Sequence, residues 1–140
     1  MRRSNLPATL VLLALLLFPI QSLSAEVIDS TVQVTAENFL AMLDDGEYEL
    51  AWSQTSLVNQ SYLGTPEWFN KARAARPYIG YLIDRSLKTI SQHTAWTALP
   101  DGDYVRISYV TQFLNKASCL ETIVLVREGG VWSVSGYFLR

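Results

Sequence analysis

The spacing of apolar residues changes once along the chain, and this change constrains the fold more than any other feature. From about residue 32 to about residue 80, apolar residues recur every three or four positions, and beyond that they alternate with polar ones. The first spacing gives a helix one apolar face, and the second gives a strand one apolar face. Helices followed by strands predict an α+β domain, with N-terminal helices packed on one face of a curved antiparallel four-stranded meander sheet.

Three helices are expected before the sheet. The first begins near Val32 and ends at Asp44-Asp45-Gly46, because glycine favours the position past a helix end. The second covers about residues 48–56. The third begins at Thr65-Pro66-Glu67, which combines a capping hydroxyl, an early proline and an acidic first turn. Pro77 ends or kinks it.

Four strands are expected over residues 83–96, 103–113, 119–127 and 131–138. The segments Pro100-Asp101-Gly102 and Glu128-Gly129-Gly130 contain the residues that tight turns favour. Trp132 opens the last strand and alternates with Val134, which predicts that its side chain lies in the core.

The N-terminus has the layout of a secretory signal. Arg2 and Arg3 precede an apolar run over residues 8–18, and small residues lead to Ala25. The alternative is an uncleaved anchor, but the apolar run is shorter than the roughly 20 residues that span a bilayer. We therefore expect a signal peptide over residues 1–25, an extended lead-in over 26–31 and one domain over 32–140. The protein is then exported, periplasmic or secreted, without stable membrane insertion after cleavage.

Charge and cysteine content exclude several kinds of site. Two of the 11 basic residues, Arg2 and Arg3, lie in the predicted signal. The chain after the signal therefore has nine basic and 13 acidic residues and a net charge of about −4. Such a chain lacks the electrostatic footprint of a nucleic-acid-binding protein. Its single cysteine, Cys119, excludes an intramolecular disulfide and a cysteine-based zinc site. Cys119 is expected to be buried, and pairing between chains in a homodimer stays open.

Glu121 is the most informative acidic residue. Alternation places it on the same strand face as the apolar Ile123 and Leu125. A carboxylate there either pairs with a cation or sits in a pocket as a catalytic acid. We favour the ion pair, because an unpaired buried charge is costly. The candidate partners are Arg106, Lys116 and Arg127.

The remaining candidates are one histidine and three cations. His93 is the only histidine, so it cannot build a histidine-rich metal site; a solvent-facing strand position is favoured over a general base. Lys71, Arg73 and Arg76 could bind an anion, although a solvated helix face is the simpler interpretation. The chain has no Gly-rich phosphate loop, nucleophile elbow or paired-cysteine motif, and no cofactor or metal is expected.

Several stretches together carry a resemblance to a known family. They are Leu43 to Trp52, Lys71 to Arg76 followed by Gly80, Tyr109 to Lys116, Glu121-Thr122, and Trp132 to Arg140. Over nearly all of residues 32–140 the chain resembles the bacterial exported family catalogued as domain of unknown function 4019. The first stretch also resembles the helix junction of nuclear-transport-factor-like and cystatin-like domains. The resemblance implies export and an α+β fold, and it implies no activity.

Two functions are carried forward. The first is a non-enzymatic binding or accessory protein of the cell envelope, whose partner is a protein or a small molecule. The alternative is a small-molecule isomerase or hydrolase with a pocket between helices and sheet, which needs Glu121, or less readily His93, to face an enclosed cavity. Fold class alone does not choose between them.

Overall fold

The computed structural model describes residues 28–61, 65–96 and 99–140. The signal peptide expected over residues 1–25 lies outside them. The described residues form α1 (Ser30–Asp44), α2 (Tyr48–Ser53), α3 (Leu57–Ser61), α4 (Glu67–Ile79), β1 (Leu82–His93), β2 (Tyr104–Phe113), β3 (Lys116–Glu128) and β4 (Val131–Leu139).

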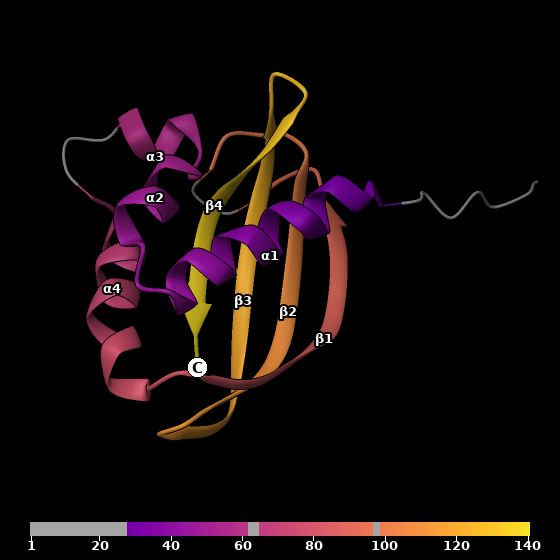
Figure 1. Cartoon of the computed structure of the whole chain (residues 1–140). Helices are drawn as coiled ribbons and strands as arrows, with labels where there is room; N and C mark the ends of the chain where they lie inside the picture. Colours follow the sequence, from indigo (N-terminus) through magenta and orange to yellow (C-terminus); the bar gives the residue numbers. More distant parts are fainter. Residues whose placement is uncertain (1–27, 62–64, 97–98) are drawn as a thin grey trace, which may run out of the picture.

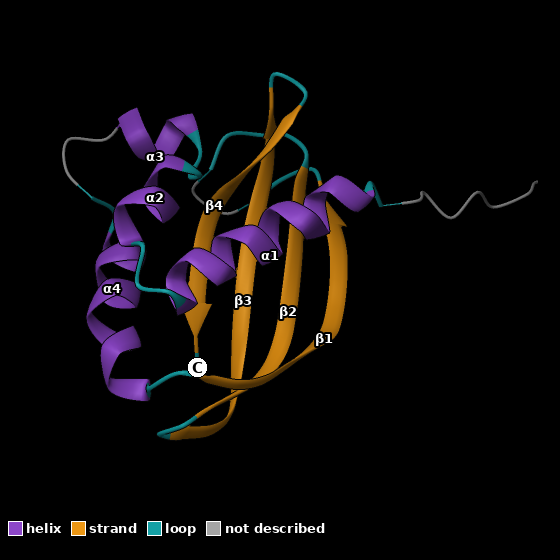
Figure 2. Ribbon diagram, in the orientation of Figure 1, coloured by secondary structure: helices purple, strands orange, loops and turns teal. Residues whose placement is uncertain are grey.

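The four strands form one antiparallel sheet in the order β1-β2-β3-β4. Helix α1 crosses one face of this sheet diagonally, and α2, α3 and α4 lie together beside β4 (Figure 1). Figure 2 distinguishes the helices from the curved strands, and in the described part of the chain every helix precedes the first strand. The predicted α+β class, with helices packed against an antiparallel meander, is confirmed.

Helix α1 begins two residues earlier than expected. The Asp29 side chain accepts a hydrogen bond of 3.0 Å from the backbone N–H of Thr31, which caps the helix at that point. The predicted end is confirmed, because α1 closes at Asp44 and Gly46 follows with a φ of 75°.

The predicted second helix is wrong beyond Ser53. There the chain leaves the helix and meets β4: Ser56 donates its backbone N–H to the carbonyl of Val134 at 2.8 Å, and Val134 donates to Gln54 at 3.1 Å. A separate short helix, α3, then begins at Leu57. Pairing with a strand that is distant in the sequence therefore replaces the local helical bonds.

Helix α4 begins at Glu67 as expected, but the Thr65 hydroxyl does not cap it. Pro66 occupies the capping position without a side-chain hydrogen bond, and the Thr65 carbonyl accepts from the Asn70 amide at 3.1 Å. Pro77 lies inside the helix, which continues to Ile79.

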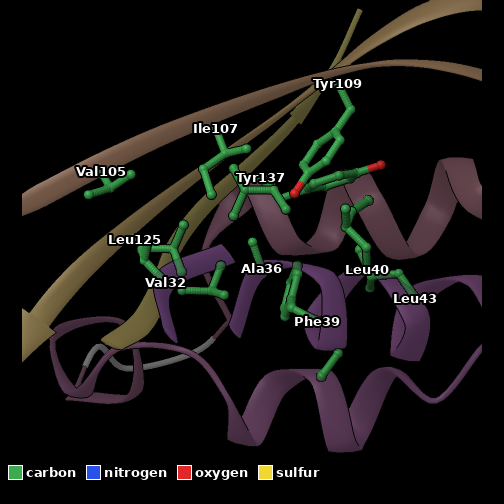
Figure 3. Packing of buried hydrophobic residues seen from close by; sticks show 14 of the residues in the cluster. Val32, Ala36, Phe39, Leu40, Leu43, Val105, Ile107, Tyr109, Leu125 and Tyr137 are labelled. Carbon is green, nitrogen blue, oxygen red and sulfur yellow. The ribbon is translucent and has the colours of Figure 1, made fainter. Parts of the chain in front are cut away.

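The main core lies between α1 and the sheet. Side chains of α1, among them Val32, Ala36 and Phe39, point toward Ile107 and Leu125 of the sheet (Figure 3). A smaller cluster lies on the other face, where Trp96 and Leu99 pack on Tyr104, Val124 and Val126. The helix-covered face is called the inner face below, and the opposite one the outer face.

Candidate functional site

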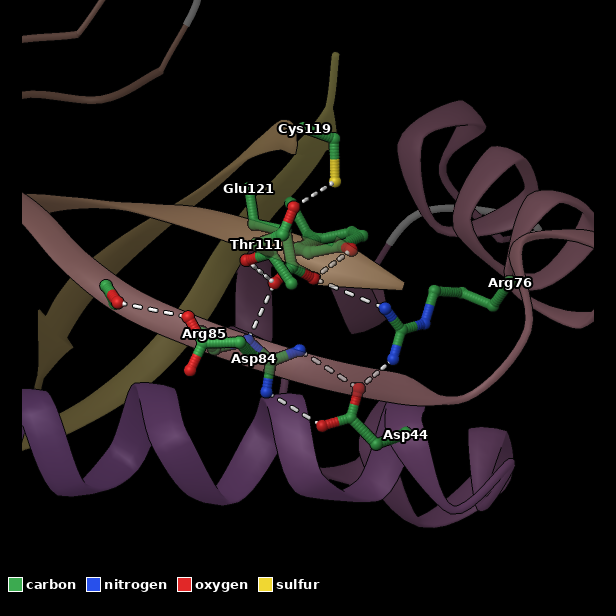
Figure 4. A network of polar contacts seen from close by, with 9 residues as sticks. Asp44, Arg76, Asp84, Arg85, Thr111, Cys119 and Glu121 are labelled. Carbon is green, nitrogen blue, oxygen red and sulfur yellow. Dashed lines mark hydrogen bonds and ion pairs between the residues drawn. The ribbon is translucent and has the colours of Figure 1, made fainter. Parts of the chain in front are cut away.

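Glu121 of β3 is fully buried on the inner face. This confirms that it shares a face with the buried Ile123 and Leu125, and it identifies Glu121 as the centre of an internal ion network (Figure 4). Its cations are Arg85 of β1 and Arg76 of α4.

The partners expected for Glu121 were wrong. Arg106 stands opposite Val124 in the register and lines a groove on the outer face. Arg127 lies over the Trp132 ring, 5.7 Å from its centroid. The structure pairs none of the three expected cations, Arg106, Lys116 and Arg127, with Glu121.

Four donors surround the Glu121 carboxylate. Oε1 accepts from the Tyr137 hydroxyl at 2.6 Å and from Arg76 Nη1 at 3.3 Å. Oε2 accepts from Arg85 Nε at 2.7 Å and from the Thr111 hydroxyl at 2.6 Å. Burial and the neighbouring Glu121 charge raise the pKa of Tyr137 well above its ordinary value, so its hydroxyl keeps the proton it donates. Both carboxylate oxygens are therefore occupied by protein donors.

Asp44, the last residue of α1, completes the network. Arg85 binds it with both terminal nitrogens, Nη1 to Oδ2 at 2.7 Å and Nη2 to Oδ1 at 3.0 Å, and Arg76 contacts Oδ1 as well. Burial opposes the charge of Arg85, but its hydrogen bonds to Asp44 and Glu121 outweigh that and raise its pKa. Two carboxylates thus face two guanidinium groups, and their charges balance.

The three candidate cations of α4 are not brought together. Arg76 is buried with its guanidinium 4.5 Å from the Phe113 ring centroid, which corrects its expected place on a solvated face. Lys71 is exposed and pairs with Glu67 at 2.7 Å, and Arg73 pairs with Glu49 at 3.4 Å. An anion site made of all three is therefore not formed.

Sequence reasoning missed Asp44 and Arg85 and misplaced Arg76. A usable signal existed for Arg76, because it follows the buried Phe69 and Ala72 at intervals of seven and four residues, on one helix face. Arg85 shares the inner face with Ile90 in the register of β1, but two register shifts interrupt simple alternation along that strand. The sequence pattern marks Asp44 only as part of the segment that ends the first helix.

His93, at the end of β1, is half-buried rather than fully solvent-facing. Its Nε2 lies 2.9 Å from the Ser91 hydroxyl, and its ring stands edge-on to Trp96 with centroids 5.0 Å apart. It lines an open groove of about 670 Å³, which we call the His93 groove. Asp103, Arg127 and Trp132 line the same groove.

Two further grooves lie elsewhere, one of about 370 Å³ between α4 and β4 and one of about 450 Å³ on the outer face. Glu121 lines none of the three grooves. Across residues 28–61, 65–96 and 99–140, no group of three or more His, Cys, Asp or Glu side chains is placed to hold a metal ion. Within the same ranges, no helix has the length and apolar character needed to span a membrane.

Cys119 is buried, as expected, and its thiol donates to the Thr111 carbonyl at 3.3 Å. Burial raises the pKa of this thiol, which keeps it protonated and unreactive near neutral pH. The residue belongs to the packing around the ion network.

The fold and the network together define a small α+β domain in which helices are fixed to an antiparallel sheet by a buried, charge-balanced cluster. Comparison with protein families matches residues 35–137 to the family described as protein of unknown function (DUF4019), and the chain belongs to this family. No curated protein and no solved structure matches the chain.

Proposed function

We propose that this protein is an exported, non-enzymatic binding domain of the cell envelope, periplasmic or secreted. One observation carries the non-enzymatic part: four protein donors occupy the Glu121 carboxylate, which lines none of the three grooves found among the described residues. A general acid or base must reach the proton it transfers, and Glu121 has no free oxygen to do so.

Binding is supported by the surface. The three grooves measure about 370, 450 and 670 Å³, which lies within the range of small-molecule sites, roughly 300–1,000 Å³. All three are open to solvent, including the one between α4 and β4, and none is an enclosed cavity. Such grooves suit reversible binding better than chemistry that excludes water.

Export is supported by the N-terminal sequence, where Arg2, Arg3 and the apolar run over residues 8–18 precede small residues. N-terminal sequencing of the protein recovered from the envelope or medium tests this. We expect the mature chain to begin at Ala25 or Glu26. Recovery of a chain that still begins at Met1, in the membrane fraction, would show that the protein is held by an uncleaved anchor.

The binding role is tested by capture from the native envelope. The protein carries a C-terminal tag, and the captured material is identified by mass spectrometry for proteins and for small molecules. We expect a partner or ligand that is absent when the same tagged chain is unfolded before capture. Equal recovery from folded and unfolded chain would contradict a specific binding function.

One observation favours the alternative, an isomerase- or hydrolase-type enzyme. His93, a residue type often used as a general acid or base, lines the His93 groove together with Asp103. The test is a screen of ester and isomerisation substrates with the wild type and His93→Asn. Turnover that disappears in His93→Asn would favour the enzyme, and no turnover in either protein favours the binding domain.

A further inference from the structure

The outer face of the sheet carries a groove whose lining differs from that of the other two. It measures about 450 Å³ and lies opposite the helix-covered core. We call it the outer groove; it is lined by Lys88, Thr89, Trp96, Arg106, Ser108, Leu120, Thr122, Val124, Phe138 and Arg140.

Three of these residues are cations, Lys88, Arg106 and Arg140, and none of the described residues that line the groove is an Asp or a Glu. Among the described residues, none of the three takes part in an ion pair. This is unexpected in a chain with 13 acidic and 11 basic residues. Like charges held together repel one another, and a bound anion would relieve the repulsion.

Hydroxyl groups lie between the cations. Ser108 of β2 stands opposite both Thr89 of β1 and Thr122 of β3, so the three form a row across the sheet. The Ser108 and Thr122 hydroxyls are 3.1 Å apart. Hydroxyls can rotate to donate to an oxyanion, so this row adds hydrogen-bond donors to the positive charge.

The rest of the lining is apolar. Phe138 of β4 is 43% exposed although it is a large aromatic residue. Its ring lies over Gly136, where an added Cβ would come within 3.2 Å of the ring, and Val124 stands opposite Gly136 in the register. Phe138, Val124, Leu120 and Trp96 therefore give the groove an apolar surface beside its cations.

We propose that the outer groove binds an amphipathic anion: an alkyl chain that carries a carboxylate or phosphate head. The cations and hydroxyls receive the head, and the apolar surface receives the chain. This inference rests on the proposed binding function and adds the chemical class of the ligand. The groove has the volume of a small-molecule site, whereas an acidic peptide would match the charges and leave the apolar surface without a role.

The test uses protein purified after expression of the full chain and titrated calorimetrically with decanoate and with decyl phosphate, each below its micelle concentration. Acetate supplies the head alone, and decyltrimethylammonium supplies the chain with the opposite charge. We expect one of the two decyl anions to bind with one molecule per chain, and which of them binds more tightly identifies the head. Acetate and decyltrimethylammonium should bind at least about ten-fold more weakly, because each lacks one half of the match.

Variants locate the site. Arg106→Gln removes an exposed charge without disturbing the core and should weaken binding about ten-fold or more. Arg73→Gln is the matched control, since Arg73 is an exposed cation, 57% accessible, on α4. Phe138→Ser should weaken the decyl anions and leave the weak binding of acetate unchanged, provided that thermal melting shows a folded protein.

Three results would overturn the proposal: no saturable binding of either decyl anion, equal loss in Arg106→Gln and Arg73→Gln, or tighter binding of a Glu-rich peptide than of decanoate. The last would identify the groove as a protein-binding surface. None of these results bears on capture from the envelope, so a wrong ligand class remains distinguishable from a wrong binding function.

Discussion

Arg85 of β1 donates a 2.7 Å hydrogen bond to Glu121 of β3 across the strand that separates them. Thr111, which faces Arg85 in the register of β2, donates to the same carboxylate oxygen at 2.6 Å. Three neighbouring strands therefore converge on one atom, Oε2 of Glu121. Asp44 adds α1 to this cluster, and Arg76 adds α4.

Glu121→Gln should lower the free energy of unfolding by about 3–5 kcal/mol, because two buried guanidinium groups lose a charged partner. Urea unfolding at neutral pH measures this. The matched control is Glu49→Gln, the same chemical change at a side chain 83% exposed, which should leave stability nearly unchanged. If Glu121→Gln does not fold, the free energy of unfolding of Asp44→Asn provides a second test of whether the network stabilises the protein. A Glu121→Gln protein as stable as the wild type would show that the ion pairs are not structural.

Gly80→Ala should destabilise the protein by about 1–3 kcal/mol, since Gly80 has φ 81° and ψ −173°, a conformation almost restricted to glycine. An added Cβ would also lie 2.9 Å from Leu114 Cβ. Gly130→Ala is the control: its φ is 80°, but nothing lies within 4 Å of the added atom. Thermal or urea unfolding should show the larger loss for Gly80→Ala, and equal losses would mean that Leu114 moves aside at no cost.

The protein should lose stability as the pH rises above about 10. Burial raises the pKa of Tyr109 to about 12, whereas in the unfolded chain it titrates near 10. Between these values the unfolded chain releases a proton that the folded one keeps, so the free energy of unfolding falls with rising pH. Burial also raises the pKa of Tyr137 well above its ordinary value, so Tyr137 acts in the same direction.

Urea unfolding at a series of alkaline pH values, with phenolate absorbance, follows this loss. Tyr109→Phe should reduce it, and at neutral pH it should be neutral or stabilising, because the buried Tyr109 hydroxyl has no partner among the described residues. Complete ionisation of the tyrosines near pH 10 in a protein that stays folded would contradict their burial.

Trp132→Ala should cost less than the roughly 3–5 kcal/mol of a fully buried large aromatic residue. Sequence alternation predicted a core position, but Trp132 is only partly buried, against the main core, with Arg127 over its ring. Trp132→Phe should retain most of the packing and lose less stability than Trp132→Ala. Urea unfolding of the two variants measures the difference, and a full loss in Trp132→Ala would indicate deeper burial than the structure shows.

The sequence sufficed for the parts of the fold that depend on local patterns. Two-residue alternation placed Glu121 on the apolar face, and the glycines after Glu128 marked the last hairpin, where Gly129 and Gly130 have φ of 57° and 80°. The cations that pair with Glu121 could not be identified from such local patterns. Arg76 and Arg85 lie far from Glu121 in the chain and reach it only because α4 packs beside the sheet and β1 stands two strands away.

The end of the second helix could not be predicted from local patterns either. The segment after Ser53 carries no signal that it will leave the helix, because the bonds that replace the helical ones come from Val134 of β4. Local propensity competes there with a partner that lies at the other end of the domain.

The meander has a consequence for how the domain forms and how long it lasts. Each strand pairs with its neighbour in the sequence, and such contacts close short loops early in folding. The ion network instead joins Asp44 of the first helix to Arg76, Arg85 and Glu121, and it can close only after sheet and helices have met. Contacts that form after the transition state act on the unfolding rate. We therefore expect the buried charges to slow unfolding and so to lengthen the lifetime of the folded domain. A protease that cleaves faster than the chain refolds would measure this lifetime.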